Sequence, residues 1–193
     1  ANIINRKANK ALCAEVEKLI SPSDSVLECA CGTGLLTKAI APKCKSIVAT
    51  DFSEKMLKRA KRKCKKYDNA LFEQANILDL AYLDESFDVV VAANVIHLLD
   101  EPLKALDELD RVCKRGGKII IPTYMNQTDK GKTNGVSDAI GKAGADFKRQ
   151  FSLDTYKQFF VEAGYVGAEY AFCQGRVPCA VAILQKKAKE QTR

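Results

Sequence analysis

The sequence predicts an α/β fold with a seven-stranded, mostly parallel sheet, helices on both faces and one antiparallel strand. Short apolar runs alternate with segments of helical period as far as about residue 122, which is typical of strands joined by crossover helices. The run FDVVVAA is apolar at successive positions, as in strands covered on both faces. Two apolar runs joined by a short turn come last and predict a hairpin.

Each element of the first half is predicted by its apolar period and its boundary residues. A helix is expected over 6–20, ended by the residues SPSD, and a buried strand over 26–29. Ser53 is a suitable N-cap for a helix that extends to about residue 66. The remaining elements of this half are a helix at 35–40 and strands at 46–51 and 70–74.

The second half repeats the alternation. Pro102 suits the first turn of a helix over 101–114, and a turn at Gly116 and Gly117 leads into a strand. Ser152 caps a further helix, which Gly164 ends. The corresponding ranges are strands at 87–93 and 117–122, a helix at 153–163 and hairpin strands at 166–172 and 179–185.

Length and composition favour one domain over residues 1–193, since 47% of the residues are hydrophobic. Residues 1–24 are expected to form a helical cap. Residues 123–150, with four glycines and little apolar period, are expected to form a partly helical excursion that acts as a lid. No apolar run is long enough to span a membrane, and the first residues lack the apolar core of a signal peptide, which predicts a soluble, cytoplasmic protein.

Cysteine usage and charge add two expectations. Eight irregularly spaced cysteines fit reduced thiols better than a disulfide framework. The formal charge of +7 is concentrated in KMLKRAKRKCKK, residues 55–66, which would suit an anionic substrate or nucleic acid, although a solvated helix face is favoured. Cys64, among these lysines, is expected to be the exposed thiol of low pKa.

The stretch SVLECACGTG, residues 25–34, carries the most specific signal. Cys29 and Cys31 could bind zinc, but no second pair of ligands follows and the chain has one histidine, so no metal is expected. A dinucleotide loop would need a third glycine, which the window Gly32–Thr37 lacks. Glu28 before the turn would repel a phosphate but attract an ammonium group.

Asp51 supplies the second half of this signal. It ends the second expected strand, 19 residues after Gly32, where a carboxylate can accept hydrogen bonds from both hydroxyls of a ribose. A ribose that carries an ammonium-bearing tail is the description of S-adenosyl-L-methionine, which becomes S-adenosyl-L-homocysteine when its methyl group is transferred.

With these residues the sequence resembles the class I S-adenosylmethionine-dependent methyltransferases, in particular the ubiquinone/menaquinone-biosynthesis-like, methyltransferase type 11 group. The resemblance covers most of residues 20–185 and implies a Rossmann-like fold. It rests on LECACGTG, ATDFSEKML, EQANILDL, FDVVVAANVIHLLDEP and LDRVCKRGGKIIIP, in that order.

The resemblance also implies roles for single residues. Glu28 would help to hold the methionine end, and Asp51 the ribose. Ala30 stands where glycine is frequent, and Asn76 stands where the family usually has an aspartate that accepts from the adenine amino group. The remaining implied cofactor-binding residues are Gly32 and Gly34 by their backbone, Phe52 and Met56 beside the adenosine, Ile77 against the adenine ring, and Asn94 at the end of the fourth strand.

Methyl transfer is an in-line displacement, so positioning and the exclusion of water are the main tasks of the protein. His97 is the candidate catalytic base, Tyr124 is a weaker one, and a structural histidine at a helix start is the alternative. A small-molecule methyl acceptor is expected as the partner. RNA or protein methylation, with nucleic acid not favoured, and a non-catalytic cofactor-binding subunit are the alternatives.

Overall fold

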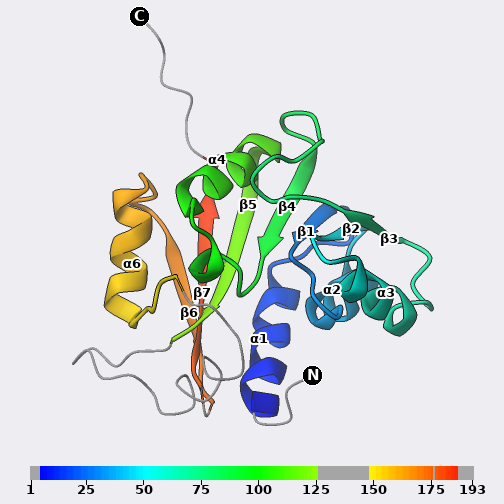
Figure 1. Cartoon of the computed structure of the whole chain (residues 1–193), viewed down its shortest axis with the longest axis horizontal. Coiled ribbons are helices and arrows are strands. Elements are labelled where there is room, and N and C mark those ends of the chain that lie inside the picture. Colours follow the sequence, from blue (N-terminus) through cyan, green and yellow to red (C-terminus); the bar gives the residue numbers. More distant parts are fainter. Residues whose placement is uncertain (1–4, 126–147, 176, 187–193) are drawn as a thin grey trace, which may run out of the picture.

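The computed structural model describes residues 5–125, 148–175 and 177–186, and it forms one seven-stranded sheet. The strands lie in the order β3-β2-β1-β4-β5-β7-β6 (Figure 1). Their bounds are β1 Ser25–Cys29, β2 Ser46–Asp51, β3 Ala70–Gln74, β4 Phe87–Ala92, β5 Cys113–Tyr124, β6 Glu169–Cys173 and β7 Cys179–Gln185. The predicted fold class is confirmed.

Strand direction also follows the prediction. β1 is parallel to β2 and β4, β2 to β3, and β4 to β5. β7 is antiparallel to both of its neighbours, with Ile121 opposite Ala182 on one side and Ala171 opposite Val181 on the other. The last hairpin therefore places a single reversed strand inside an otherwise parallel sheet.

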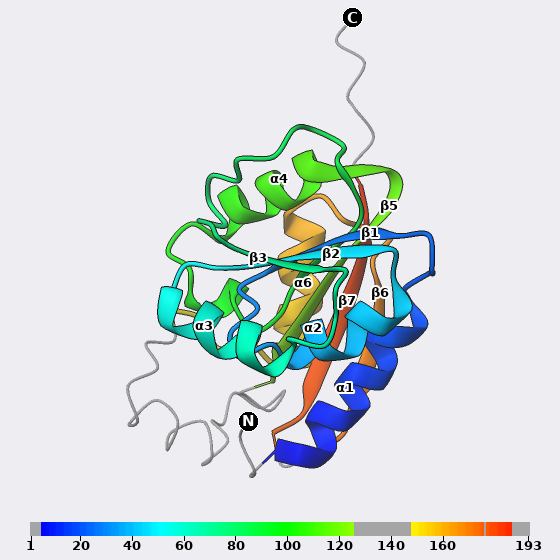
Figure 2. The same ribbon diagram turned by 90° about the vertical axis from the view of Figure 1, so that its right-hand side faces the viewer.

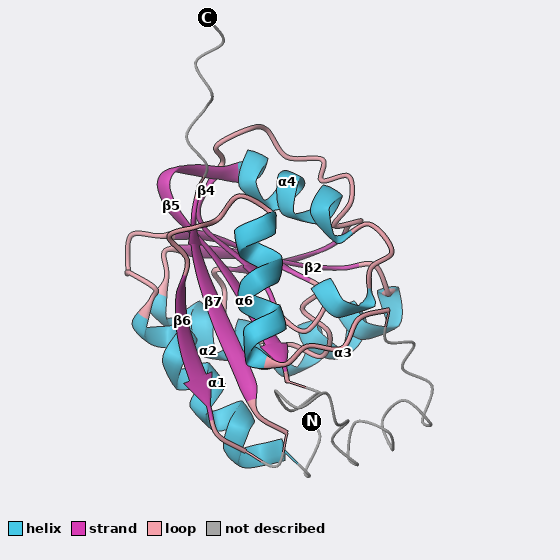
Figure 3. Ribbon diagram, turned by 90° about the vertical axis from the view of Figure 1, so that its left-hand side faces the viewer, coloured by secondary structure: helices cyan, strands magenta, loops and turns pink. Residues whose placement is uncertain are grey.

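The helices of the described residues cover both faces of the sheet. α1 (Arg6–Lys18), α2 (Leu35–Ile40) and α3 (Glu54–Lys63) lie on one face, as Figures 1 and 2 show. α4 (Pro102–Val112) and α6 (Leu153–Glu162) cover the other face, which Figure 3 presents to the viewer. The two layers bury separate apolar clusters. Leu27 and Cys29 of β1 point toward α4 and α6, whereas Val26 points toward α1 and α2.

The predicted boundary residues act as expected. The Ser53 hydroxyl accepts a hydrogen bond from the Met56 N–H, and Ser152 forms a reciprocal capping box with Thr155. Pro102 is the first residue of α4.

The structure differs from the prediction at two kinds of place. Short 3-10 helices, η2 (Ala41–Lys43) and η3 (Ile96–Leu98), were not predicted, because three residues are too few to show a period. β5 begins at Cys113, directly after α4, rather than after the Gly116–Gly117 turn. A register shift between Phe87 and Val89 absorbs the extra residues.

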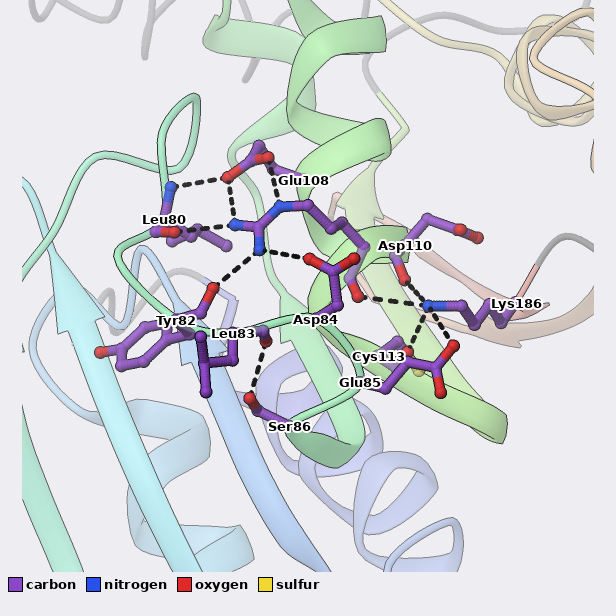
Figure 4. Close-up of polar contacts among 11 residues, drawn as sticks. Leu80, Tyr82, Leu83, Asp84, Glu85, Ser86, Glu108, Asp110, Cys113 and Lys186 are labelled. Atoms are coloured by element: carbon purple, nitrogen blue, oxygen red, sulfur yellow. Dashed lines mark hydrogen bonds and ion pairs between the residues drawn. The ribbon is translucent and has the colours of Figure 1, made fainter. Parts of the chain in front are cut away.

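A polar cluster ties the 80–86 loop and the end of β7 to the carboxyl end of α4 (Figure 4). Lys186 Nζ donates to three backbone carbonyls, those of Asp110 at 2.7 Å, Arg111 at 3.2 Å and Cys113 at 2.6 Å. The Arg111 guanidinium donates to Glu108 and to the carbonyls of Leu80 and Tyr82. The lysine donates to carbonyls that have no partner within the helix, and the Arg111 carbonyl also accepts the Glu85 N–H at 2.9 Å.

Among the described residues, no helix combines the length and apolar character needed to cross a bilayer. The core of the predicted excursion, residues 126–147, lies outside the described residues.

Candidate functional site

A cavity of about 530 Å³ lies at the carboxyl ends of β1, β2, β3 and β4. In a parallel sheet these ends meet at one edge, so the turns that follow the four strands surround a common space. Its walls are largely apolar, with a carboxylate and two amide side chains among them. The lining residues are Ala30, Gly32, Thr50, Asp51, Phe52, Met56, Ala75, Asn76, Ile77, Ala93, Asn94, Val95, Leu98 and Leu99.

Eight of the eleven residues predicted for the site lie in this lining. They are Ala30, Gly32, Asp51, Phe52, Met56, Asn76, Ile77 and Asn94. Six further lining residues were not predicted from the sequence: Thr50, Ala75, Ala93, Val95, Leu98 and Leu99. Most of these are small or aliphatic and carry no chemical signal, but each lies within a few residues of a predicted one.

The turn after β1 brings bare backbone to the cavity. Ala30 and Gly32 have φ of +55° and +56°, the left-handed region that disfavours residues with a Cβ. A Cβ on Gly32 would meet nothing within 4 Å, so the space beside it is open. Ala30 therefore holds a strained conformation, and it stands where glycine is frequent in the family that the sequence resembles. Backbone strain of this kind is often found at binding sites.

Gly34, in contrast, faces the protein interior rather than the cavity. It is the N-cap of α2 with φ of +76°, and a Cβ there would lie 3.2 Å from Ala60 Cβ and 3.1 Å from Cys64 Sγ. Gly34 therefore permits the close approach of α2 to α3, and the backbone contact with a cofactor that was predicted for it stays a prediction.

Asp51 connects the ends of β1 and β2. Its Oδ2 accepts the Gly32 N–H at 2.8 Å, and its Oδ1 accepts the Ser53 N–H at 2.8 Å. Each oxygen retains a further lone pair, so the carboxylate can still accept hydrogen bonds from a ligand. These two bonds fix the carboxylate at the edge of the cavity.

Phe52 and Met56 form the rim on the α3 side. The Phe52 ring is 74% exposed, which is unusual for a large aromatic side chain, and it borders the cavity. Met56, in the first turn of α3, is partly buried beside it.

Asn76 and Asn94 share one hydrogen-bonding arrangement. Asn76 Oδ1 accepts the N–H of Leu78 at 3.0 Å, and Asn94 Oδ1 accepts the N–H of Tyr124 at 3.1 Å. A backbone N–H requires an acceptor, so these bonds assign the two amide oxygens. Asn76 Oδ1, predicted to accept from an adenine, already accepts one hydrogen bond within its own turn, and a second lone pair and the Nδ2 donor remain.

Glu28 lies under α2, outside the cavity lining. It is 2% exposed, and its Oε2 accepts the Thr37 hydroxyl at 2.5 Å. Burial raises the pKa of Glu28 to about 8, although the Thr37 hydrogen bond acts in the opposite direction. The side chain predicted to hold an ammonium group is therefore largely protonated at neutral pH.

His97 is also buried, at 3% exposure, within η3. Burial lowers its pKa to about 4, so the imidazole is neutral at physiological pH. Val95 and Leu98 on either side line the cavity, but His97 itself does not. Its role as a base stays a prediction. The Tyr124 hydroxyl, the weaker candidate, donates to Asn9 Oδ1 of α1 at 2.8 Å.

The expectation of an exposed, low-pKa thiol at Cys64 is wrong. Cys64 is 1% exposed, and burial raises its pKa despite the nearby Lys38 and Lys63. Leu57, Ala60 and Cys64 recur at helical spacing on the buried side of this segment, a signal that the surrounding lysines obscured. Within the described ranges, no three metal-binding side chains gather.

Comparison with known proteins agrees with this geometry. A family profile described as "Methyltransferase domain" matches residues 27–121, from β1 to β5. The demethylmenaquinone methyltransferase of Lactococcus lactis subsp. lactis is 30% identical over 171 residues, covering 76% of this chain and 67% of that protein. The chain belongs to the class I S-adenosylmethionine-dependent methyltransferases.

Another relative in this family is the phosphatidylethanolamine N-methyltransferase of Cereibacter sphaeroides, 32% identical over 120 residues, covering 61% of this chain and 58% of that protein. The chain spans about half the length of the curated relatives that it matches first. Among solved structures, the N-methyltransferase NodS of Bradyrhizobium japonicum WM9, in complex with S-adenosyl-L-homocysteine, superposes with a TM-score of 0.72. It is 19% identical, and the match covers 94% of this chain and 88% of NodS.

Proposed function

We propose that the protein transfers the methyl group of S-adenosylmethionine to an apolar small molecule bound in the cavity at the ends of β1–β4. The observation that carries the proposal is the Asp51 carboxylate, fixed by two backbone N–H groups and facing an otherwise largely apolar cavity. The carboxylate can accept hydrogen bonds from the ribose hydroxyls, and the apolar walls can contact the adenine ring.

The residues around the cavity suit the parts of this cofactor. Asp51 would accept from the ribose, Phe52, Met56 and Ile77 would contact the adenosine, and Asn76 would face the edge of the base. The Gly32 backbone leaves room for the methionine portion, with Glu28 beneath it. When bound, the cofactor supplies an electrophilic methyl group, and the protein aligns the acceptor and excludes water.

The acceptor side of the cavity is aliphatic, with Val95, Leu98 and Leu99 in its wall. The relatives named for demethylmenaquinone and phosphatidylethanolamine support a small-molecule acceptor with apolar parts. His97 remains the proposed base. With a pKa of about 4 it would be neutral throughout pH 5 to 9, so it would give the methyl-transfer rate no pH dependence in that range. Residues 1–24 as a cap and 123–150 as a lid remain parts of this proposal.

Two measurements test the proposal. Calorimetric titration with S-adenosyl-L-homocysteine should give a saturable 1:1 isotherm. Incubation with methyl-tritiated S-adenosylmethionine and either a prenylated naphthoquinol or phosphatidylethanolamine vesicles should transfer tritium to the organic phase. Absence of binding at 1 mM ligand would contradict the cofactor assignment. Binding without transfer to either acceptor, but with transfer to RNA or protein, would contradict the acceptor class.

A further inference from the structure

The positive charge of the chain is concentrated on one surface. Residues 35–68 contain eleven Lys and Arg and three Asp and Glu, a net charge of +8, whereas the rest of the chain carries −1 and the whole chain +7. All eleven basic side chains are exposed. This surface, here named the basic face, consists of Lys38, Lys43, Lys45, Lys55, Lys58, Arg59, Lys61, Arg62, Lys63, Lys65 and Lys66.

The helices α2 and α3, which carry most of the basic face, lie side by side, as Figures 1 and 2 show. Gly34 at the start of α2 approaches Ala60 in the middle of α3, which allows this contact. Among ion pairs between described residues, one is found on this face, from Lys58 Nζ to Glu54 Oε1 at 3.0 Å. Most of the positive charge is therefore not neutralised by neighbouring carboxylates.

Apolar side chains lie where the basic face meets the cavity. Phe52, 74% exposed, precedes α3 and lines the cavity, and Leu35, 38% exposed, begins α2. Phe52 belongs to the turn after β2, and Leu35 is the first residue of the helix that follows β1. The cavity rim thus carries the exposed Phe52 ring, and the basic residues of α3 begin three positions later, at Lys55.

We propose that the basic face docks the protein on the surface of an anionic lipid bilayer, with Phe52 and Leu35 at the headgroup boundary and the cavity rim next to the lipid. Exposed aromatic and aliphatic side chains beside many lysines are typical of interfacial binding, in which anionic headgroups attract the cations and the apolar groups insert. Docking in this orientation would let an apolar acceptor pass from the bilayer into the cavity without crossing water.

A polynucleotide would also be attracted by eleven cations. The exposed Phe52 ring could stack on a base as well as insert among lipids, so the choice of a bilayer rests on the proposed apolar acceptor and on the aliphatic Leu35. Because this inference rests on the proposed function, the docking experiment is performed without an acceptor. Cofactor binding is measured separately, so that failure of the docking can be distinguished from failure of the proposed function.

The experiment is co-sedimentation of the chain with vesicles of phosphatidylcholine and phosphatidylglycerol at 7:3, and with phosphatidylcholine alone, in about 0.1 M salt. The variant Arg59→Glu/Arg62→Glu reverses two charges of the basic face away from the cavity. The control Lys104→Glu/Lys157→Glu makes the same change in net charge on α4 and α6, on the other face of the sheet. A fluorescent 20-nucleotide single-stranded RNA is titrated in parallel.

We expect binding to the anionic vesicles only, weakened at least tenfold in the basic-face variant and less than twofold in the control. The basic-face variant should bind S-adenosyl-L-homocysteine within twofold of the wild type and keep its circular dichroism spectrum. Equal losses in both variants, undiminished binding in the basic-face variant, or binding to RNA but not to vesicles would each overturn the proposal.

Discussion

Asp51 Oδ2, at the end of β2, accepts the backbone N–H of Gly32 at 2.8 Å and so fixes the turn after β1 against the neighbouring strand. The same carboxylate is the proposed ribose acceptor. Asp51→Ala should weaken binding of S-adenosyl-L-homocysteine by about 1.5 to 3 kcal/mol, because a charged acceptor is lost and the turn is released. Calorimetric titration measures this change.

Asp51→Asn is the matched control, since it keeps one acceptor oxygen in a side chain of the same shape. We expect it to lose less affinity than Asp51→Ala. Unchanged affinity in a folded Asp51→Ala variant would remove the ribose role from this residue.

Gly34 and Gly32 should respond differently to the same substitution. Gly34→Ala would force a Cβ against Ala60 and Cys64 at a φ of +76°, and we expect a loss of about 2 to 4 kcal/mol in the free energy of unfolding. The Cβ of Gly32→Ala would meet open space, so we expect a loss of only about 1 kcal/mol in the free energy of unfolding, caused by the positive φ. This variant should weaken cofactor binding more than Gly34→Ala does. Urea unfolding and calorimetry separate the two effects. Equal stability losses in both variants would contradict the α2–α3 contact.

Glu28 should make the ligand-free protein less stable as pH rises. Its pKa in the folded state, about 8, lies above its value of about 4.3 in the unfolded chain, so the folded state holds the proton more tightly and loses stability between these values. From pH 5.0 to 7.5, the free energy of unfolding of the wild type should fall by at least about 2 kcal/mol relative to that of Glu28→Gln. Parallel pH dependences of the two proteins in urea unfolding would show that Glu28 is already ionised in the folded state.

His97 should change stability in the opposite direction, so that the protein becomes less stable as pH falls. Its pKa is about 4 in the folded state and about 6.5 in the unfolded chain, so as pH falls the unfolded chain takes up the proton first and stability is lost. Between pH 7.5 and 5.0, the wild type should lose about 2 kcal/mol that His97→Asn does not lose. His97 is the only histidine in the chain, so no other imidazole contributes. If methyl transfer uses His97, the variant should also lower the rate about 10²-fold with little change in cofactor affinity.

Lys186 should matter more for stability than a typical surface lysine. Its side chain is 8% exposed and donates to three carbonyls at the end of α4 (Figure 4). Lys186→Met should lower the free energy of unfolding by about 2 to 4 kcal/mol. Lys114→Met provides the comparison, because Lys114 is 41% exposed and pairs with Asp88, a contact worth about 1 kcal/mol or less. Similar losses in the two variants by urea unfolding would show that the carbonyl contacts contribute little.

The sheet and much of the cavity lining were predictable because both follow from local patterns. Asp51 is the last residue of β2, and Asn76 and Asn94 each lie two residues after the end of a strand. Parallel topology alone brings such positions to one edge. The last hairpin predicted that the sheet has one antiparallel strand near its edge. The insertion of β7 between β5 and β6 could not be predicted, because strand order depends on contacts between distant segments.

Side-chain direction was the part that the sequence concealed. Glu28 and Gly34 both belong to the predicted cofactor-binding motif. The Glu28 side chain nevertheless lies under α2, and the Gly34 backbone packs against α3. Cys64 was misjudged because its side chain is buried against Gly34, whereas the lysines beside it in sequence are exposed to solvent. The two asparagine oxygens are used by nearby backbone N–H groups, and only the folded turns reveal this.

The place of β7 has a consequence for the order in which the sheet can assemble during translation. The strands β1 to β5 pair with one another and emerge from the ribosome before residue 179. β6 emerges next but finds no neighbour, since β7 occupies the position between it and β5. Until β7 has been synthesised, one edge of β5 stays open to pairing with another chain. The nascent protein thus depends on β7 both to join β6 to the sheet and to close an edge prone to aggregation.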